Sequence, residues 1–168
     1  MTTAKHQERF QTLLDEHKRI LYKVCHLYCR NRDDREDLAQ EIIVQLWRSF
    51  GRFDEHYRFS TWMYRIALNV AISSYRRETT RTRHVISDNE HVFDAVDETT
   101  SQPEDIRLLY RFIEKLDELN KALVLLYLDG KSYAEIAGVL GISETNVATK
   151  INRLKNSMKQ EFSSRQAG

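Results

Sequence analysis

Aromatic rings alternate with arginines in a short stretch of the chain between residues 52 and 62. The sequence there reads Arg-Phe-Asp-Glu-His-Tyr-Arg-Phe-Ser-Thr-Trp. Rings offer faces on which unpaired bases stack, and arginines bind the phosphates that join those bases. The stretch therefore suits an unpaired nucleic-acid strand. The alternative for Phe59 and Trp62 is that their rings belong to the hydrophobic core.

A second pattern, near the C-terminus, predicts a helix-turn-helix. Ser132 and Glu135 form a capping box that begins a short helix, and Gly141 follows that helix where a side chain would clash in a sharp turn. Ser143 then caps a second helix, whose Val147 faces the core. This spacing of cap, turn and apolar residues is typical of a DNA-reading helix-turn-helix.

The second of these helices would lie in the major groove of DNA. From residue 142 to residue 168 the chain has five Lys or Arg and two Asp or Glu, an excess that favours phosphate contact. Thr149 and Lys150 have side chains that can touch base edges. The alternative is a solvated basic face on a packing helix. The predicted DNA contacts of this domain are Ser143, Thr145, Ala148, Thr149, Lys150, Asn152, Arg153 and Lys155.

The sequence offers no catalytic centre. It has no paired acid and base carboxylates, no glycine-rich phosphate loop and no nucleophile elbow. Cys25 and Cys29 share one helix face with His17 two turns earlier, but a zinc site needs about four ligands and usually a second short-spaced pair. We expect both cysteines to be buried and inert. We expect no enzyme activity, no metal and no cofactor.

Composition indicates a helical protein that positions these residues. The chain of 168 residues has one proline and five glycines, so it is poor in tight turns and is predicted to be all-α. A net charge of +1, with 41% hydrophobic and 30% charged residues, is typical of a globular chain. Its two cysteines exclude a disulfide framework. Because no signal peptide or long apolar segment is present, we expect a cytoplasmic protein.

Charge divides the chain into two small helical domains and an acidic linker. Residues 1–80 have 14 basic and 11 acidic side chains, residues 81–105 have two and seven, and residues 106–168 have ten and seven. The middle segment lacks helical periodicity and is predicted to be a flexible linker, with a cap at Ser101 for the helix that follows. In the first domain an apolar stripe recurs at helical spacing from Phe10 to Tyr28, and a later helix is expected to begin at Ser60 or Thr61.

Both domains resemble the extracytoplasmic-function (ECF) sigma factors of the bacterial sigma-70 family. The resemblance rests on Asp37-Leu38-Ala39-Gln40-Glu41, Phe59-Ser60-Thr61-Trp62 and Tyr75-Arg76-Arg77, and further on Ser132-Tyr133-Ala134-Glu135-Ile136-Ala137 and Ile151-Asn152-Arg153-Leu154. It implies a dissociable subunit that directs core RNA polymerase to promoters. The first domain would open and read the −10 element, and the second would read the −35 element. The polymerase would perform the chemistry.

The resemblance also assigns residues to the −10 element. Loop 53–59 would hold an extruded base, while the helix after it would contact the adjacent duplex and its phosphates. For Asn69 the alternative is a partly buried amide whose hydrogen bonds are satisfied inside the protein. The predicted −10 contacts are Arg52, Phe53, His56, Tyr57, Arg58, Phe59, Thr61, Trp62, Arg65, Asn69, Ser73, Arg76 and Arg77.

Partners follow from the same resemblance. A polar face made of Asp37, Gln40, Glu41 and Gln45 would dock on the β′ clamp of core RNA polymerase, the alternative being a merely solvated face. The second domain would meet the β flap, and the acidic linker would enter the nucleic-acid channel or serve as a plain tether. An anti-sigma factor would cover the polymerase-binding surfaces. The alternative function is a helix-turn-helix regulator that contacts polymerase without melting DNA.

Overall fold

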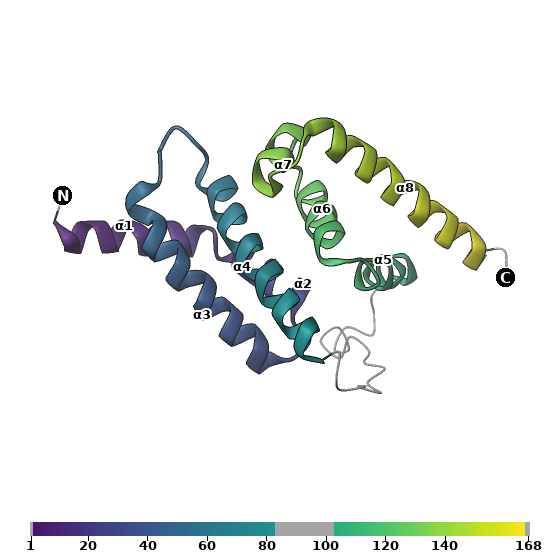
Figure 1. Ribbon diagram of the computed structural model, residues 1–168, viewed down its shortest axis with the longest axis horizontal. Helices are drawn as coiled ribbons and strands as arrows, with labels where there is room; N and C mark the ends of the chain where they lie inside the picture. The colour runs from purple at the N-terminus through teal and green to yellow at the C-terminus, as the bar shows by residue number, and fades with distance from the viewer. Residues whose placement is uncertain (1, 83–102, 167–168) are drawn as a thin grey trace. The chain divides into compact units, whose positions relative to one another are not determined.

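The structure, a computed structural model, describes residues 2–82 and 103–166, and these residues form helices without any strand (Figure 1). The chain divides into two compact units, residues 1–92 and 93–168. The predicted all-α fold with two helical units is thus confirmed. Most of the predicted linker, 81–105, lies outside the described residues, although residues 81–82 continue one helix and residues 104–105 begin another. No described helix is both long and apolar enough to cross a membrane.

The first unit contains α1 (Thr3–Glu16), α2 (Lys18–Tyr28), α3 (Arg32–Ser49), the short 3-10 helix η1 (Phe50–Arg52) and α4 (Phe59–Thr82). The apolar stripe predicted from Phe10 to Tyr28 is divided between α1 and α2, because His17 between them has φ −116° and ψ 18°. Asn31 caps α3 by accepting a hydrogen bond of 2.8 Å from the backbone N–H of Asp34. α4 begins at Phe59, just before the predicted start at Ser60 or Thr61.

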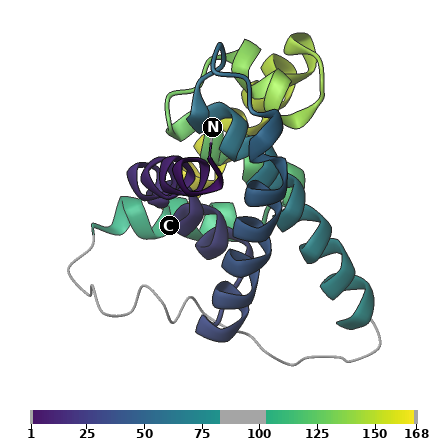
Figure 2. The same ribbon diagram turned by 90° about the vertical axis from the view of Figure 1, so that its left-hand side faces the viewer.

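Three helices bury the core of the first unit, since α2, α3 and α4 all pack against one another. Their fully buried side chains include Val24, Ile42, Leu46, Met63 and Tyr64. Each such side chain contributes roughly 1.5–3 kcal/mol when it leaves water. Figures 1 and 2 show α3 and α4 joined at one end by the loop that follows η1. The packed core therefore fixes both ends of the aromatic and basic loop.

The second unit contains α5 (Glu104–Glu114), α6 (Glu118–Leu128), α7 (Tyr133–Leu140) and α8 (Glu144–Gln166). Asp117 caps α6 by accepting a hydrogen bond of 2.8 Å from the N–H of Asn120. The predicted cap at Ser101 lies outside the described residues. Leu123 and Leu126 of α6 are fully buried, as are Ile136 of α7 and Val147 of α8. This core holds α7 and α8 at a fixed crossing.

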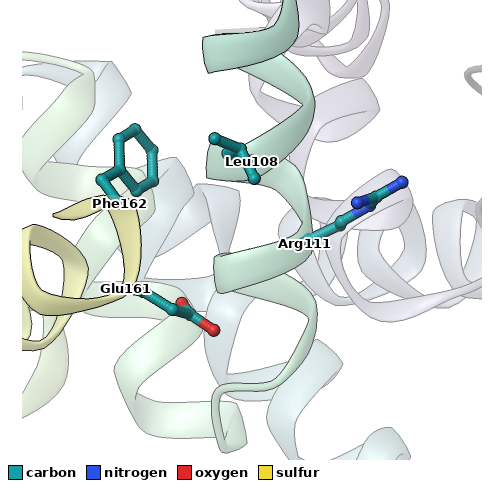
Figure 3. A pocket seen from close by; sticks show the side chains of 4 residues that line it. All are labelled: Leu108, Arg111, Glu161 and Phe162. Carbon is teal, nitrogen blue, oxygen red and sulfur yellow. The ribbon is translucent and has the colours of Figure 1, made fainter. Parts of the chain in front are cut away.

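A shallow hollow between α5 and α8 is lined by Leu108, Arg111, Glu161 and Phe162 (Figure 3). The carboxylate of Glu161 lies 2.7 Å from Nζ of Lys115, so it is already paired with a cation of the same unit. These four side chains do not include a nucleophile paired with a base. We therefore assign the hollow to helix packing and not to a functional site.

Candidate nucleic-acid interface

The loop between η1 and α4 is shaped by Asp54. Its carbonyl oxygen accepts a hydrogen bond of 3.1 Å from the N–H of Tyr57, which closes a turn. Its Oδ1 accepts one of 3.0 Å from the N–H of His56 and lies 2.7 Å from Nδ1 of the same residue. The two interactions with His56, first the backbone hydrogen bond, lower the pKa of the Asp54 carboxyl group. Glu55 forms an ion pair with Arg9 of α1. The loop thus has a defined shape, with the Tyr57 side chain 69% exposed at its tip.

A cluster of aromatic rings packs at the base of this loop, where the loop joins η1 and α4. The ring of Phe53 lies 5.5 Å from that of Phe59 and 5.0 Å from that of Trp62, and Phe50 and Trp62 are 6.2 Å apart. His17 adds a further ring 4.9 Å from Phe59. Edge and tilted contacts of this kind add about 0.5–1.5 kcal/mol per pair beyond the area buried.

The aromatic residues of this segment differ in exposure, although their residue types give no sign of the difference. His56 and Tyr57 are exposed, Phe53 and Trp62 are half-buried, and Phe59 is only 7% exposed. Phe59 therefore packs in the core, as the core alternative predicts, and the DNA contact predicted for this residue stays a prediction. Arg52 and Arg58 are exposed on either side of the loop.

One face of α4 carries the remaining predicted −10 contacts. Arg65, Asn69 and Ser73 are exposed and follow one another at intervals of four residues, so they form one stripe along the helix. Thr61 and Trp62 lie half-buried at its start, and Arg76 and Arg77 are exposed near its far end. Because Asn69 is exposed, the alternative of a partly buried amide is wrong.

A polar face on α3 lies beside the far end of that stripe. Asp37, Gln40, Glu41 and Gln45 are all exposed there. The sequence analysis missed Val44 on the same face, a valine that is 47% exposed; its signal is its spacing of four and three residues from Gln40 and Glu41. A single exposed valine is ordinary on a protein surface, so Val44 extends the description of this face and does not by itself mark an interface.

The polar face of α3 and the stripe on α4 are linked by one ion pair. Nη2 of Arg77 lies 3.0 Å from Oε1 of Glu41, although sequence reasoning assigns Arg77 to DNA and Glu41 to the polymerase. Both side chains are largely exposed, so the pair contributes about 0–1 kcal/mol and can be exchanged for other partners.

The helix-turn-helix has the predicted geometry. Oγ of Ser132 accepts a hydrogen bond of 3.1 Å from the N–H of Glu135, and the Glu135 carboxylate reaches back to complete the capping box. Gly141 has φ 71°, a left-handed conformation that side chains disfavour. Its N–H and that of Ile142 both donate to the carbonyl of Ala137, which closes the turn. Oγ of Ser143 caps α8 by accepting a bond of 3.1 Å from Asn146.

α8 presents most of the predicted −35 contacts on its outer side. Ser143, Thr145, Thr149, Asn152 and Arg153 are exposed, and Ala148 and Lys150 are half-buried. Val147 and Ile151 face the core as predicted.

Lys155 of α8 is engaged within the second unit. Its Nζ lies 4.7 Å from the centre of the Tyr127 ring on α6, and a hydrogen bond with Tyr127 raises the pKa of Lys155. Lys155, which the sequence analysis predicts to contact DNA, therefore contacts α6 from α8 in this structure.

Cys25 and Cys29 are free thiols, the first buried and the second half-buried. Across residues 2–82 and 103–166, no group of three or more His, Cys, Asp or Glu side chains is placed to hold a metal ion. Burial raises the pKa of Cys25 to about 12 and that of Cys29 to about 11. Both residues therefore remain protonated at neutral pH, as expected for structural cysteines.

We expect both cysteines of the folded chain to react slowly with Ellman's reagent at pH 8. Only the thiolate attacks, and an ordinary cysteine has a pKa of about 8.5, so these two should react at least about 100-fold more slowly. Unfolding the chain in guanidinium should restore the ordinary rate, which provides the control. Fast reaction of the folded protein would contradict the burial of these thiols.

Comparison with known proteins identifies both units. Residues 13–81 match sigma-70 region 2, and residues 106–158 match sigma-70 region 4. The chain is 28% identical to the ECF RNA polymerase sigma factor SigW of Bacillus subtilis, over 93% of this chain and 90% of SigW. It is 30% identical to the ECF RNA polymerase sigma-E factor of Escherichia coli K12, over 83% of this chain and 81% of that protein.

Two solved structures share the fold. The sigma factor RpoE of Bartonella quintana, in complex with the anti-sigma factor NepR, aligns with a TM-score of 0.74 and 18% identity over 93% of this chain and 98% of its own. CnrH, in complex with the cytosolic domain of CnrY, aligns with a TM-score of 0.65 and 23% identity over 94% of this chain and 90% of its own. With two region matches in order along the sequence, the chain belongs to the ECF sigma factors of the sigma-70 family.

Proposed function

We propose that this sigma factor, which directs RNA polymerase to specific promoters, melts the −10 element with its first unit and reads the −35 element with α8. The observation that carries the proposal is the pairing of two different nucleic-acid surfaces on one chain. The first has an exposed ring, Tyr57, on a fixed loop between Arg52 and Arg58, which suits an unpaired strand. The second has a basic helix after a tight turn, which suits duplex DNA.

The exposed residues of the first unit support a proposed path for the DNA. An extruded −10 base would sit against Tyr57 and His56, above the supporting cluster of Phe53, Phe59 and Trp62. The stripe of Arg65, Asn69 and Ser73 on α4 would contact the adjoining duplex, with Arg76 and Arg77 toward phosphates.

The polymerase would bind the polar face of α3. Asp37, Gln40, Glu41 and Gln45 offer acidic and amide groups for a basic helix of the β′ clamp, and Val44 adds an apolar contact among them. The β flap would bind the second unit. The polymerase supplies the active centre, so this chain would not itself be an enzyme, and it would act in the cytoplasm.

An anti-sigma factor is the remaining proposed partner. RpoE of Bartonella quintana was solved with the anti-sigma factor NepR bound, and CnrH with the cytosolic domain of CnrY bound. Exposed apolar side chains such as Ile106 and Tyr110 of α5, each 40% exposed, would suit a partner of this class.

Run-off transcription with purified core RNA polymerase on a genomic library tests the proposed function. We expect defined start sites that appear only when the chain is added, with a shared −10 and −35 sequence upstream of them. Permanganate footprinting at those sites should show unpaired thymines across the −10 element. The alternative, a helix-turn-helix regulator that contacts polymerase without melting DNA, would instead give DNA binding with no permanganate signal.

A further inference from the structure

α2 carries a second basic and aromatic surface that the proposed function does not use. Within α2 the chain has three Lys or Arg and no Asp or Glu. The inner side of α2 buries Ile20, Val24, Cys25 and Tyr28 in the unit that also contains α3 and α4. The helical spacing places most of the polar residues of α2, and Tyr22, on the opposite side. This surface, the α2 face, consists of Lys18, Arg19, Tyr22, Lys23 and His26.

An aromatic platform lies in the middle of the α2 face. Tyr22 is 64% exposed, and its ring stacks on that of His26 with the ring centres 3.7 Å apart and the planes at 30°. Nδ1 of His26 lies 2.9 Å from the carbonyl oxygen of Tyr22, which fixes the imidazole in this position. Burial lowers the pKa of His26, which favours the neutral imidazole in this stack.

The α2 face begins at the aromatic cluster under loop 53–58. His17, directly before α2, has its ring 4.9 Å from that of Phe59, the first residue of α4. Lys18 and Arg19 follow in the first turn of α2, where both are exposed and neither forms an ion pair with another described residue. A strand that leaves the loop can therefore meet two cations and then a stacked ring.

We propose that the α2 face binds single-stranded DNA, extending the path of the strand that loop 53–58 separates from the duplex. The proposal rests on the proposed function and adds a second contact segment to it. Cations interspersed with an exposed ring match the phosphates and bases of an unpaired strand. An acidic protein segment would match the cations but would gain less from a stacked aromatic pair.

Photocrosslinking locates the strand directly. The probe is p-benzoyl-phenylalanine in place of Tyr22, in full-length chain assembled with core RNA polymerase on a promoter mapped by run-off transcription. Val44 on α3, 47% exposed, is the matched control position. We expect position 22 to crosslink to the displaced strand of the open complex and position 44 not to. Crosslinks from position 22 only to polymerase, or to nothing, overturn the proposal.

Charge removal measures the contribution of the two cations. Lys18→Gln/Arg19→Gln is compared with Lys5→Gln/Arg48→Gln, which removes two exposed cations from α1 and α3. On a template with a premelted bubble, two lost phosphate contacts should lower the slope of log affinity against log salt by about 1.4 and the affinity at 0.1 M salt by about tenfold. The control variant should match the wild type. Equal values for the two variants overturn the proposal.

The outcomes also separate this inference from the proposed function. If the wild-type chain fails to initiate with core polymerase, the proposed function fails, and the α2 face has no melted strand to bind. If the wild type initiates and Lys18→Gln/Arg19→Gln behaves like the control, only the α2 proposal fails. Polyglutamate and single-stranded DNA can each be tested as competitors of the premelted template. If polyglutamate displaces the template as effectively as single-stranded DNA, the α2 face is a general anion site and the proposal is overturned.

Discussion

Replacing Tyr57 with alanine is expected to slow open-complex formation by about 10- to 100-fold. Tyr57 is 69% exposed in a loop whose turn is closed by Asp54, so the substitution removes the stacking surface and leaves its support intact. Stacking of a base on an aromatic ring contributes about 1–3 kcal/mol, and each 1.4 kcal/mol is a factor of ten. The measurement is the rate of permanganate reactivity at a promoter mapped by run-off transcription.

Tyr57→Phe is the matched control, because it keeps the ring and removes only the hydroxyl. It should open promoters at nearly the wild-type rate. Phe59→Ala is unsuitable for this test, because Phe59 is buried and its truncation costs about 3–5 kcal/mol of stability. If Tyr57→Ala keeps both the thermal stability and the melting rate of the wild type, the proposed role of the loop is wrong.

The helix-turn-helix could be predicted from the sequence because its interactions are local. The capping bond between Ser132 and Glu135 and the one between Ser143 and Asn146 each span three residues. Gly141 has a positive φ, a backbone conformation that glycine adopts more readily than other residues, so this signal lies in a single residue. Similarly, the break before α6 follows from the cap at Asp117. Signals of this range are complete in a short piece of sequence.

Burial in the first unit could not be predicted in the same way, because it depends on residues far apart in the chain. Phe59 and Tyr57 both have aromatic side chains and are two residues apart, yet only Phe59 contacts the ring of His17, which lies between α1 and α2. The pair formed by Arg77 and Glu41 joins residues 36 positions apart, and no local pattern announces it. Sequence patterns therefore predict which segment carries these aromatic rings but do not separate the exposed rings from the buried ones.

The ion pair between Arg77 and Glu41 connects the proposed polymerase surface with the proposed DNA surface. Because Glu41 and Arg77 are paired, the polar face of α3 and the α4 stripe that we propose to contact DNA meet at an exchangeable ion pair. A polymerase helix that binds Glu41 would release the Arg77 guanidinium for a phosphate. Docking of the polymerase and contact with DNA are then mutually favourable at this point, which fits a subunit that acts only when assembled.

Lys150→Ala/Arg153→Ala is expected to lower affinity for promoter DNA by about 100-fold through the −35 element alone. Both residues are on the helix that follows the turn, three positions apart, so one face presents both. A specific contact with a base edge is worth about 1–3 kcal/mol, and two such contacts give this loss. The measurement is the affinity of the reconstituted holoenzyme for a mapped promoter, with and without a scrambled −35 sequence.

The double variant and the wild type should bind the scrambled promoter equally, because the first unit alone then holds the DNA. Lys115→Ala is the control. Lys115 belongs to the same unit but lies outside α8, and its ammonium group is paired with Glu161. It should leave the affinity unchanged, as an exposed ion pair contributes about 0–1 kcal/mol. A variant that loses affinity equally on both promoters would make the basic residues of α8 general phosphate contacts, and −35 reading would have to reside in other side chains.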